Sequence, residues 1–387
     1  MNVPKIRFKG FECEWGKTTF ADLLAFERPD EYIVKSTEYS DFYKTPVLTA
    51  NKGFILGYTN ETRTYNQECI IFDDFTLDSK YVDFPFMVKS SAMKILTLKD
   101  KEHSNLFFVH SLLSHANIEI LGHARHYISV VQPTNVRIPA TFVEQQQIAE
   151  YFKNLDSLIE ATGKKVASLK QTKQACLQSM FPQPGETTPR IRFKGFEGDW
   201  EKKQIGDIST SSKGNGYSKA DLRLEGTPIV LYGRMYTKYS FEMDNIDTFA
   251  TPKDGAVYSK GNEVVIPASG ETAEDIAIAA AIKQSGVILG GDLNILTFND
   301  DYLPSFMALC ISNSETHYEL SKFAQGKSVV HLRNNDIAKG TVTCPSRVEQ
   351  QQIASFFSNL DKQIALQEQR LEKLKQIKAA CLDNMFV

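Results

Sequence analysis

The residues of this chain that could bind a nucleotide centre on Gly326-Lys327-Ser328. A phosphate-binding loop needs a further glycine five residues before Gly326, so that successive backbone N–H groups surround the phosphate. That place holds Ser321, and no apolar strand comes before it. We therefore expect no nucleotide-binding loop at these three residues.

A second group with possible chemistry is formed by histidines. Five of the seven histidines lie at positions 103, 110, 115, 123 and 126. His123 and His126 are close enough to share a metal ion, but no cysteine or acidic residue near them has the spacing of a ligand. The six cysteines, at positions 13, 69, 176, 310, 344 and 381, form no C-x-x-C pair. We expect no metal site and reduced thiols, as in a cytoplasmic protein.

The composition limits the classes of protein to which the chain can belong. Its 387 residues predict two or three domains, and 24% charged residues with 42% hydrophobic residues are typical of a globular protein. A net charge of −3 excludes a surface that is basic all over, so any nucleic-acid binding must come from local clusters. The first residues, MNVPKIRFKG, lack the apolar segment of a secretion signal, and no apolar run reaches the roughly 18 residues of a membrane span. A cytoplasmic protein is expected.

An internal repeat organises the sequence. KIRFKGFECEW at 5–15 returns as RIRFKGFEGDW at 190–200, with 8 of 11 positions identical. A longer box at 143–181 returns at 348–386 with 21 identities in 39 positions. The regions between these boxes diverge, and the second is longer by 205 − 185 = 20 residues. The pattern indicates a tandem duplication with pseudo-two-fold symmetry, in which a constant frame holds two different interiors.

The two long boxes predict paired helices. Apolar residues recur at alternating spacings of four and three, which is typical of a coiled coil, although a core helix of an ordinary bundle gives a related pattern. Pseudo-two-fold symmetry makes the pair antiparallel, with Ile148 opposite Met385. Lys173 and Lys378 are then expected opposite Leu360 and Leu155, with their amines reaching toward water. The residues predicted to pair the helices are Ile148, Phe152, Leu155, Ile159, Val166, Leu169, Met180, Ile353, Phe357, Leu360, Ile364, Leu371, Leu374 and Met385.

The regions between the boxes read as mixed α/β domains. Strands are expected at 69–75, 86–98 and 127–132 in the first and at 228–233, 263–268 and 286–298 in the second, with helices near 105–116 and 304–324. The fold class is therefore α+β, with two pseudo-two-fold-related mixed α/β domains separated by a pair of long antiparallel coiled-coil helices. The predicted boundaries are a first domain at 1–142, a helix at 143–181, a linker at 182–189, a second domain at 190–347 and a helix at 348–387.

These motifs resemble the specificity (S) subunit of type I restriction–modification enzymes. The resemblance rests on the RFKGFE-x-x-W box, on GKSVVHLRNNDIAKGTVTCPSRVEQQQIASFFSNLD, and on its partner VRIPATFVEQQQIAEYFKNLD. It implies that each variable region is a target recognition domain that reads one half of a split DNA sequence. It also implies that the paired helices set the gap between the half-sites and help to seat two methyltransferase (M) subunits.

The resemblance implies that catalysis belongs to partner chains. An adenine methyltransferase needs a [DNS]-P-P-[YFW] sequence for the flipped base, and no Pro-Pro occurs here. We therefore expect no catalytic residue and no bound cofactor in this chain. S-adenosylmethionine is expected on the methyltransferase subunits of an adenine-N6 DNA methyltransferase. ATP and Mg are expected on the restriction (R) motor-nuclease subunits that complete the endonuclease, and no membrane is expected among the partners.

Candidate DNA contacts are basic, aromatic and hydroxyl residues that cluster near strand ends. Trp15 and Trp200 are excluded, because residues that read different targets have no reason to be identical in both repeats, and they are expected to serve packing. The candidates are Arg63, Tyr65, Lys89, Ser90, Ser91, Lys94, Arg125 and His126 in the first region and Tyr232, Arg234, Tyr236, Lys238, Lys327, Ser328, His331 and Arg333 in the second.

A second hypothesis is a coiled-coil scaffold that bridges DNA or other partners without sequence choice. Such a bridge has no need of two divergent domains inside one constant frame. The divergence therefore favours a subunit that reads DNA sequence for separate catalytic chains.

Overall fold

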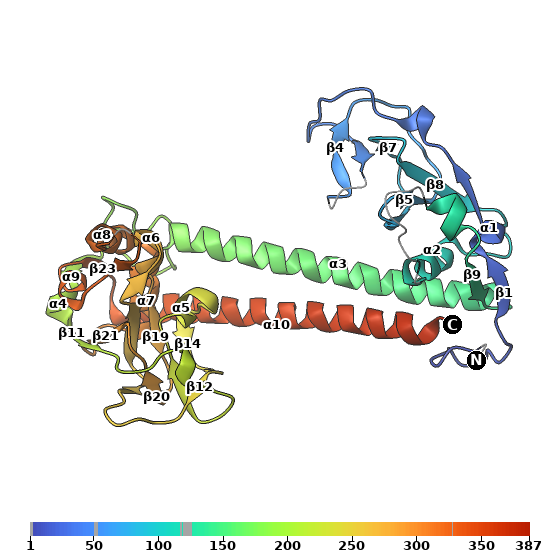
Figure 1. The fold of residues 1–387 in the computed structure, drawn as a ribbon. Helices are drawn as coiled ribbons and strands as arrows, with labels where there is room; N and C mark the ends of the chain where they lie inside the picture. The colour runs from blue at the N-terminus through green and yellow to red at the C-terminus, as the bar shows by residue number, and fades with distance from the viewer. Residues whose placement is uncertain (1–2, 50–52, 117, 119–125, 327) are drawn as a thin grey trace. The chain divides into compact units, whose positions relative to one another are not determined.

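The computed structural model describes residues 3–49, 53–116, 118, 126–326 and 328–387. It divides into two compact units, the first made of residues 1–164 and 368–387 and the second of residues 165–367. Two long helices, α3 (Phe142–Ser179) and α10 (Arg347–Met385), each begin in one unit and end in the other (Figure 1). Each unit therefore contains one half of each helix.

The first unit combines two small sheets with one helix packed on them. The four-stranded sheet has the order β2-β8-β5-β6 with antiparallel neighbours, and the three-stranded sheet has the order β4-β3-β7 with β3 and β7 parallel. Helix α2 packs against β5 and β6. The elements are β1 (Gly16–Thr19), α1 (Phe20–Leu23), β2 (Leu24–Glu27), a 3₁₀ turn (Asp30–Tyr32), β3 (Thr45–Leu48), β4 (Ile55–Thr59), β5 (Cys69–Asp73), β6 (Ser79–Val82), β7 (Met87–Val88), β8 (Met93–Leu98), α2 (Leu106–His115), a π-helical turn (Tyr127–Val131) and β9 (Asn135–Ile138).

The second unit repeats this arrangement with more strands. One sheet has the order β11-β21-β17-β19-β14 and another the order β12-β15-β13-β20-β16, while α7 packs against β17 and β19. The strands are β10 (Glu201–Gln204), β11 (Ser209–Lys213), β12 (Leu222–Arg223), β13 (Thr227–Val230), β14 (Glu242–Met243), β15 (Phe249–Ala250), β16 (Tyr258–Lys260), β17 (Glu263–Pro267), β18 (Ser269–Gly270), β19 (Ala280–Ile282), β20 (Ser285–Leu289), β21 (Leu293–Phe298), β22 (Val330–His331) and β23 (Thr341–Cys344). The helices are α4 (Ile205–Ile208), a 3₁₀ turn (Lys219–Asp221), α5 (Arg234–Thr237), α6 (Ala273–Ile276), α7 (Pro304–Asn313), α8 (Glu315–Phe323) and α9 (Asn334–Ile337).

The start and end of each variable domain lie side by side on a pair of antiparallel strands, which we call the frame strands. In the first unit β1 pairs with β9, and in the second β10 pairs with β23, both antiparallel. Thr19 lies opposite Asn135, and Gln204 lies opposite Thr341. The residues between the two strands of a pair therefore form a domain whose two ends are joined by strand pairing.

The tryptophans of the short boxes are buried, as predicted, and each packs against the end of a long helix. The ring of Trp15 lies 6.2 Å from that of Phe386, and the ring of Trp200 lies 6.3 Å from that of Phe181. Backbone bonds add to this contact, because Ile6 N donates to Asn384 O at 2.9 Å and Ile191 N donates to Ser179 O at 2.9 Å. The same packing thus closes both units.

Four expected elements differ from the structure. The expected strand at 86–98 is two strands, β7 and β8, with the loop 89–92 between them. The expected strand at 127–132 is wrong: Gln132 N donates to Tyr127 O, and Tyr127 and Val131 are buried while Ile128 is exposed, which is a helical period. The expected helix at 304–324 breaks at Ser314, whose hydroxyl donates to Cys310 O and accepts from Thr316 N. The expected strand at 286–298 is two strands, β20 and β21, with Gly290 and Gly291 between them.

The paired helices stop slightly short of the predicted 143–181 and 348–387, at Ser179 and Met385. In the part of the chain that the structure describes, no helix combines the length and apolar character that crossing a membrane requires.

Candidate nucleic-acid interface

The start of each variable domain is bound to a long helix by a pair between a half-buried arginine and a buried glutamate. Arg7 donates from Nε to Glu144 Oε1 at 2.6 Å and from Nη2 to Glu144 Oε2 at 2.8 Å. Arg192 makes the same two bonds to Glu349, both at 2.7 Å. The side-chain hydrogen bond to the carboxylate raises the pKa of each guanidinium. The RFKGFE box and the EQQQ box are therefore two halves of one contact.

A glutamine next to each glutamate binds the start of a domain helix that lies earlier in the chain. Gln145 Oε1 accepts from Asn105 N at 3.1 Å, and its Nε2 donates to His103 O at 3.2 Å. Gln350 Oε1 accepts from Leu303 N at 2.8 Å, and its Nε2 donates to Asp301 O at 3.1 Å. The segments held are those that lead into α2 and α7. The amide thus holds the start of the helix in each variable domain.

Lysine–aspartate pairs fix the register of the helices within each unit. Lys378 Nζ lies 2.5 Å from Asp156 Oδ1, and Lys173 Nζ lies 2.5 Å from Asp361 Oδ1. The helices run antiparallel, within one residue of the predicted register. Asp156 and Asp361, which directly follow the predicted partners Leu155 and Leu360, bind the two amines that were expected to reach toward water.

The side chains predicted to pair the helices line their buried side. Four of the fourteen, Ile159, Leu169, Leu371 and Leu374, are half-buried. The other ten are buried: Ile148, Phe152, Leu155, Val166, Met180, Ile353, Phe357, Leu360, Ile364 and Met385.

Three candidate DNA contacts of the first region are core residues, and these predictions are corrected. Tyr65 is buried beside Phe86, with ring centroids 5.5 Å apart, and burial raises its pKa to about 12. Lys94 is buried on β8, and its amine lies 2.9 Å from Asp74 Oδ2. His126 is buried, and its backbone N–H donates to Asp74 O. These three side chains are buried inside the domain and are not surface groups.

The remaining candidates of the first region lie at its surface. Lys89, Ser90 and Ser91 are exposed in the loop between β7 and β8, with Lys89 Nζ donating to Tyr39 Oη at 3.1 Å. Arg63 is exposed and lies 2.6 Å from Glu31 Oε2. Arg125 lies outside the described residues, as does His123. The loop after β7 is thus a cluster of polar groups open to a partner.

In the second region the structure links a basic group with an acidic residue that the sequence did not indicate. Asp247 accepts from Arg234 Nη1 at 2.5 Å and from Lys238 Nζ, and these bonds hold its pKa well below the usual range. Tyr232 and Tyr236 flank the group at the surface, with ring centroids 6.4 Å apart. The charge available to phosphates here is therefore lower than the sequence predicts.

The two candidate groups of the second region meet at Ser269. Tyr236 Oη donates to Ser269 O at 2.8 Å, and Ser269 Oγ lies 3.2 Å from His331 Nδ1. Ser328 and Arg333 are exposed on either side of His331, and Lys327 lies outside the described residues. The antiparallel pair β18–β22 thus joins residues that are 62 positions apart.

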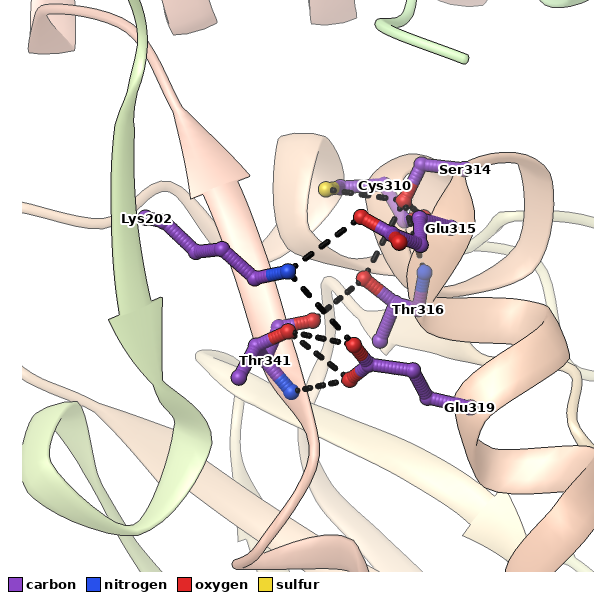
Figure 2. A network of polar contacts seen from close by, with 7 residues as sticks. All are labelled: Lys202, Cys310, Ser314, Glu315, Thr316, Glu319 and Thr341. Carbon is purple, nitrogen blue, oxygen red and sulfur yellow. Dashed lines mark hydrogen bonds and ion pairs between the residues drawn. The ribbon is translucent and has the colours of Figure 1, made fainter. Parts of the chain in front are cut away.

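A polar network fastens α8 to the frame strands β10 and β23 (Figure 2). The amine of Lys202 lies 3.2 Å from Glu315 Oε2 and 3.6 Å from Glu319 Oε1. Glu319 also accepts from Thr341 N at 2.7 Å, and Thr316 Oγ1 donates to Thr341 O at 2.7 Å. These partners have no common signature in the sequence, because they lie on three separate elements.

The residues considered for nucleotide or metal binding can be placed in the structure in part. Gly326 has a φ of +144° and lies in a turn closed by bonds between the backbones of Gln325 and His331. Within the ranges that the structure describes, no group of three or more His, Cys, Asp or Glu side chains could hold a metal ion.

Comparisons with known proteins agree with this duplicated arrangement. The sequence model of a family described as the type I restriction modification DNA specificity domain matches residues 12–171 and 197–376. The type I restriction enzyme EcoR124I/EcoR124II specificity subunit of Escherichia coli is 27% identical over 366 residues, which cover 91% of this chain and 87% of that protein. The crystal structure of a type I restriction–modification system S subunit from M. genitalium has a TM-score of 0.69 at 13% identity, covering 100% of this chain and 99% of that one, and shares its fold.

Proposed function

Because the chain belongs to the family of type I restriction–modification DNA specificity proteins, as a specificity subunit with two recognition domains, we propose that each domain reads one half of a bipartite DNA target. The observation that carries this proposal is the equivalence of the frame contacts. Arg7–Glu144 and Arg192–Glu349 fix two domains whose interiors share little sequence. Two domains that are attached in the same way but differ in their interiors suit two readers of different half-sites.

The long helices would set the gap between the half-sites. Helix α3 has 38 residues and α10 has 39, so each rises about 57 Å at about 1.5 Å per residue. The Lys378–Asp156 and Lys173–Asp361 pairs prevent one helix from sliding along the other within either unit. A fixed register is what a ruler for the unread base pairs needs.

Two copies of one methyltransferase subunit would dock on the frame. Burial explains many of the identities between the long boxes, but not those at the surface. Val143 is 54% exposed and the equivalent Val348 is 70% exposed. An exposed apolar side chain does not stabilise the fold, so the identity of these two residues needs another explanation. The exposed and identical positions around them are Gln146 and Gln351, Gln147 and Gln352, and Asn154 and Asn359. Spacings of three and four place these residues on one helix face, which suits one partner bound twice.

Equivalent grooves lie beside these faces. A groove of about 540 Å³ in the first unit is lined by Val143, Gln146 and Phe107, among others. A groove of about 330 Å³ in the second unit is lined by Gln351, Ala354 and Ser305, among others. Each groove lies where a long helix begins and the helical layer of a recognition domain meets it. The grooves share the equivalent helix positions Gln146 and Gln351, whereas their other walls differ: Phe107 lines the first, and Ser305 and Glu242 line the second.

The chemistry of the assembled complex would come from the partners. The methyltransferase subunits would carry S-adenosylmethionine and methylate adenine at N6, and restriction subunits would carry ATP and Mg. The specificity subunit then contributes selection of the site and no reacting group. Docking on two faces would give two methyltransferase subunits to each copy of this chain.

Docking is tested by placing a charge on each face in turn. Val143→Asp and Val348→Asp should each remove one methyltransferase subunit from the co-purified complex, because a carboxylate in the contact loses its water without a partner. Aspartate is tolerated at the start of a helix, so both variants should fold. Leu366→Asp, at an exposed position that is not identical in the repeats, is the matched control. Full stoichiometry in both face variants would contradict this docking site.

The reading function is tested by selection. The complex with its methyltransferase should methylate, from a randomised DNA library, only molecules with two constant half-sites separated by a constant gap. Methylation without sequence preference would contradict the proposal and favour a non-specific DNA bridge.

A further inference from the structure

Two apolar side chains stand out from the surface of the recognition domains. Phe42 is 95% exposed and Leu224 is 100% exposed, which makes them the two most exposed large apolar side chains among the residues that the structure describes. Neither has a place in the core clusters of its own unit. Isolated exposed apolar residues are common, so exposure alone assigns no role.

The two residues occupy equivalent places in the two domains. Phe42 lies three residues before the Thr-Pro that opens β3, and Leu224 lies three residues before the Thr-Pro that opens β13. Each of these strands lies between one antiparallel and one parallel neighbour, β4 and β7 for β3 and β15 and β20 for β13. The strands that follow, β8 and β21, are equivalent as well. The two most exposed apolar side chains thus occupy the same topological position in the two domains, which indicates a shared role.

Both tips are held by specific backbone contacts. In the first domain Tyr43 N donates to Ser40 O at 3.0 Å, and Phe42 N donates to Ser40 Oγ at 3.3 Å. In the second, Gly226 has a φ of +137°, and a Cβ at that residue would lie 2.8 Å from Ala250 O. Only glycine therefore fits the turn after Leu224. Each apolar side chain is therefore held in solvent by a turn with defined backbone contacts.

The charges beside the tips favour contact with bases over contact with phosphates. An exposed basic and an exposed acidic residue lie within two positions of each tip: Lys44 and Asp41 beside Phe42, and Arg223 and Glu225 beside Leu224. Phosphates repel carboxylates, so neither tip suits the DNA backbone. In the major groove, by contrast, carboxylates accept from cytosine, arginine donates to guanine and apolar groups pack on the thymine methyl.

The difference between the tips favours DNA over a partner protein. A methyltransferase subunit bound twice would meet the same side chain twice, as at Val143 and Val348. The tips instead carry Phe in one domain and Leu in the other, within loops of unrelated sequence. Two domains that read unlike half-sites require different side chains at the same position, as is found here.

We infer that Phe42 and Leu224 pack against base edges in the DNA groove, each within the half-site of its own domain, and so determine sequence preference there. This inference rests on the proposed function and adds the residues that carry the reading. Burying one such side chain on binding tightens the complex by about tenfold or more.

The test compares alanine variants in the complete complex with its methyltransferase. Phe42→Ala should relax the preference in one half-site only, and Leu224→Ala in the other only, with the gap unchanged. Each should raise the Kd for the intact target by about tenfold or more and leave binding to unrelated DNA unchanged. Leu158→Ala and Leu366→Ala remove exposed apolar side chains from the helices and are the matched controls. Both tip side chains are fully solvated, so thermal unfolding should be unaffected.

Other outcomes would overturn the inference. Unchanged preference and affinity would show that the tips do not touch bases. Weaker binding to all sequences alike would assign them to the backbone, and loss of methyltransferase from the complex would assign them to a protein contact. Absence of any preference in the unaltered complex would instead refute the proposed function, so the two failures are distinguishable.

Discussion

The buried pair between Arg192 and Glu349 should be the costliest single contact of the second unit to break. In Arg192→Ala the carboxylate of Glu349, which is 1% exposed, loses both of its guanidinium bonds. Removal of one partner of a buried ion pair costs about 3–5 kcal/mol. The N-terminus of α10, where Glu349 lies in the first turn, recovers about 0.3–1 kcal/mol of this. We therefore expect a loss of about 2–4 kcal/mol.

The loss is measured by calorimetry of the full chain together with hydrogen exchange of residues 347–360. The melting temperature of the second unit should fall by about 5–15 °C, while amides of the first unit keep their protection. Arg190→Ala is the matched control, since Arg190 is an exposed partner of Glu186 and its loss should change stability by less than about 0.5 kcal/mol. The double variant Arg192→Ala with Glu349→Gln should recover part of the loss, because no buried charge remains. An Arg192→Ala variant as stable as the control would refute the reasoning.

Three further outcomes are expected. Asp247→Asn frees Lys238, whose side chain is 63% exposed, for a phosphate, so DNA affinity should rise and its salt dependence should steepen by about one unit of log–log slope; an unchanged slope would show that Lys238 does not reach a phosphate. Insertion of seven residues into both long helices keeps the apolar seam and adds about 10 Å, so the selected gap should lengthen by about three base pairs with both half-sites unchanged and binding weakened by the rotation of one groove; an unchanged gap would contradict the ruler. Ile6 N donates to Asn384 O, so joining the two ends through a copy of the 182–189 linker and opening the chain within that linker should preserve folding and DNA modification; a permuted chain that cannot fold would contradict the equivalence of the two closures.

The sequence predicted the frame well because the duplication displays it twice. A stripe such as Ile148, Phe152 and Leu155 has a local period, and two copies of the same stripe indicate a symmetric partner. The tryptophans were assigned to packing by the same comparison. What the repeat could not reveal is which box touches which, since the pairing of Arg7 with Glu144 spans 137 positions.

The candidate DNA contacts were predicted less well, for a physical reason. Lys94 lies in a strand that is buried along most of its length, and its partner Asp74 is 20 positions away, so nothing local distinguishes it from a solvated lysine. Arg234 and Lys238 likewise bind Asp247, which lies 13 and 9 positions after them in the chain. Interleaved basic and aromatic residues mark a surface only when no carboxylate lies opposite, and that depends on the tertiary fold. Phe42 and Leu224 were missed because one exposed apolar residue has no signature in sequence.

A graft of one domain onto the other's place measures most directly whether two independent readers share one frame. Residues 20–134 of the first domain are replaced by residues 205–340 of the second, joined where Thr19 lies opposite Asn135 and Gln204 lies opposite Thr341. The complex with its methyltransferase then selects its sites from a randomised DNA library. The account predicts a symmetric target made of two copies of the second half-site in opposite orientation, with the original gap. A folded graft that still selects the first half-site, or that selects an unrelated sequence, would contradict it.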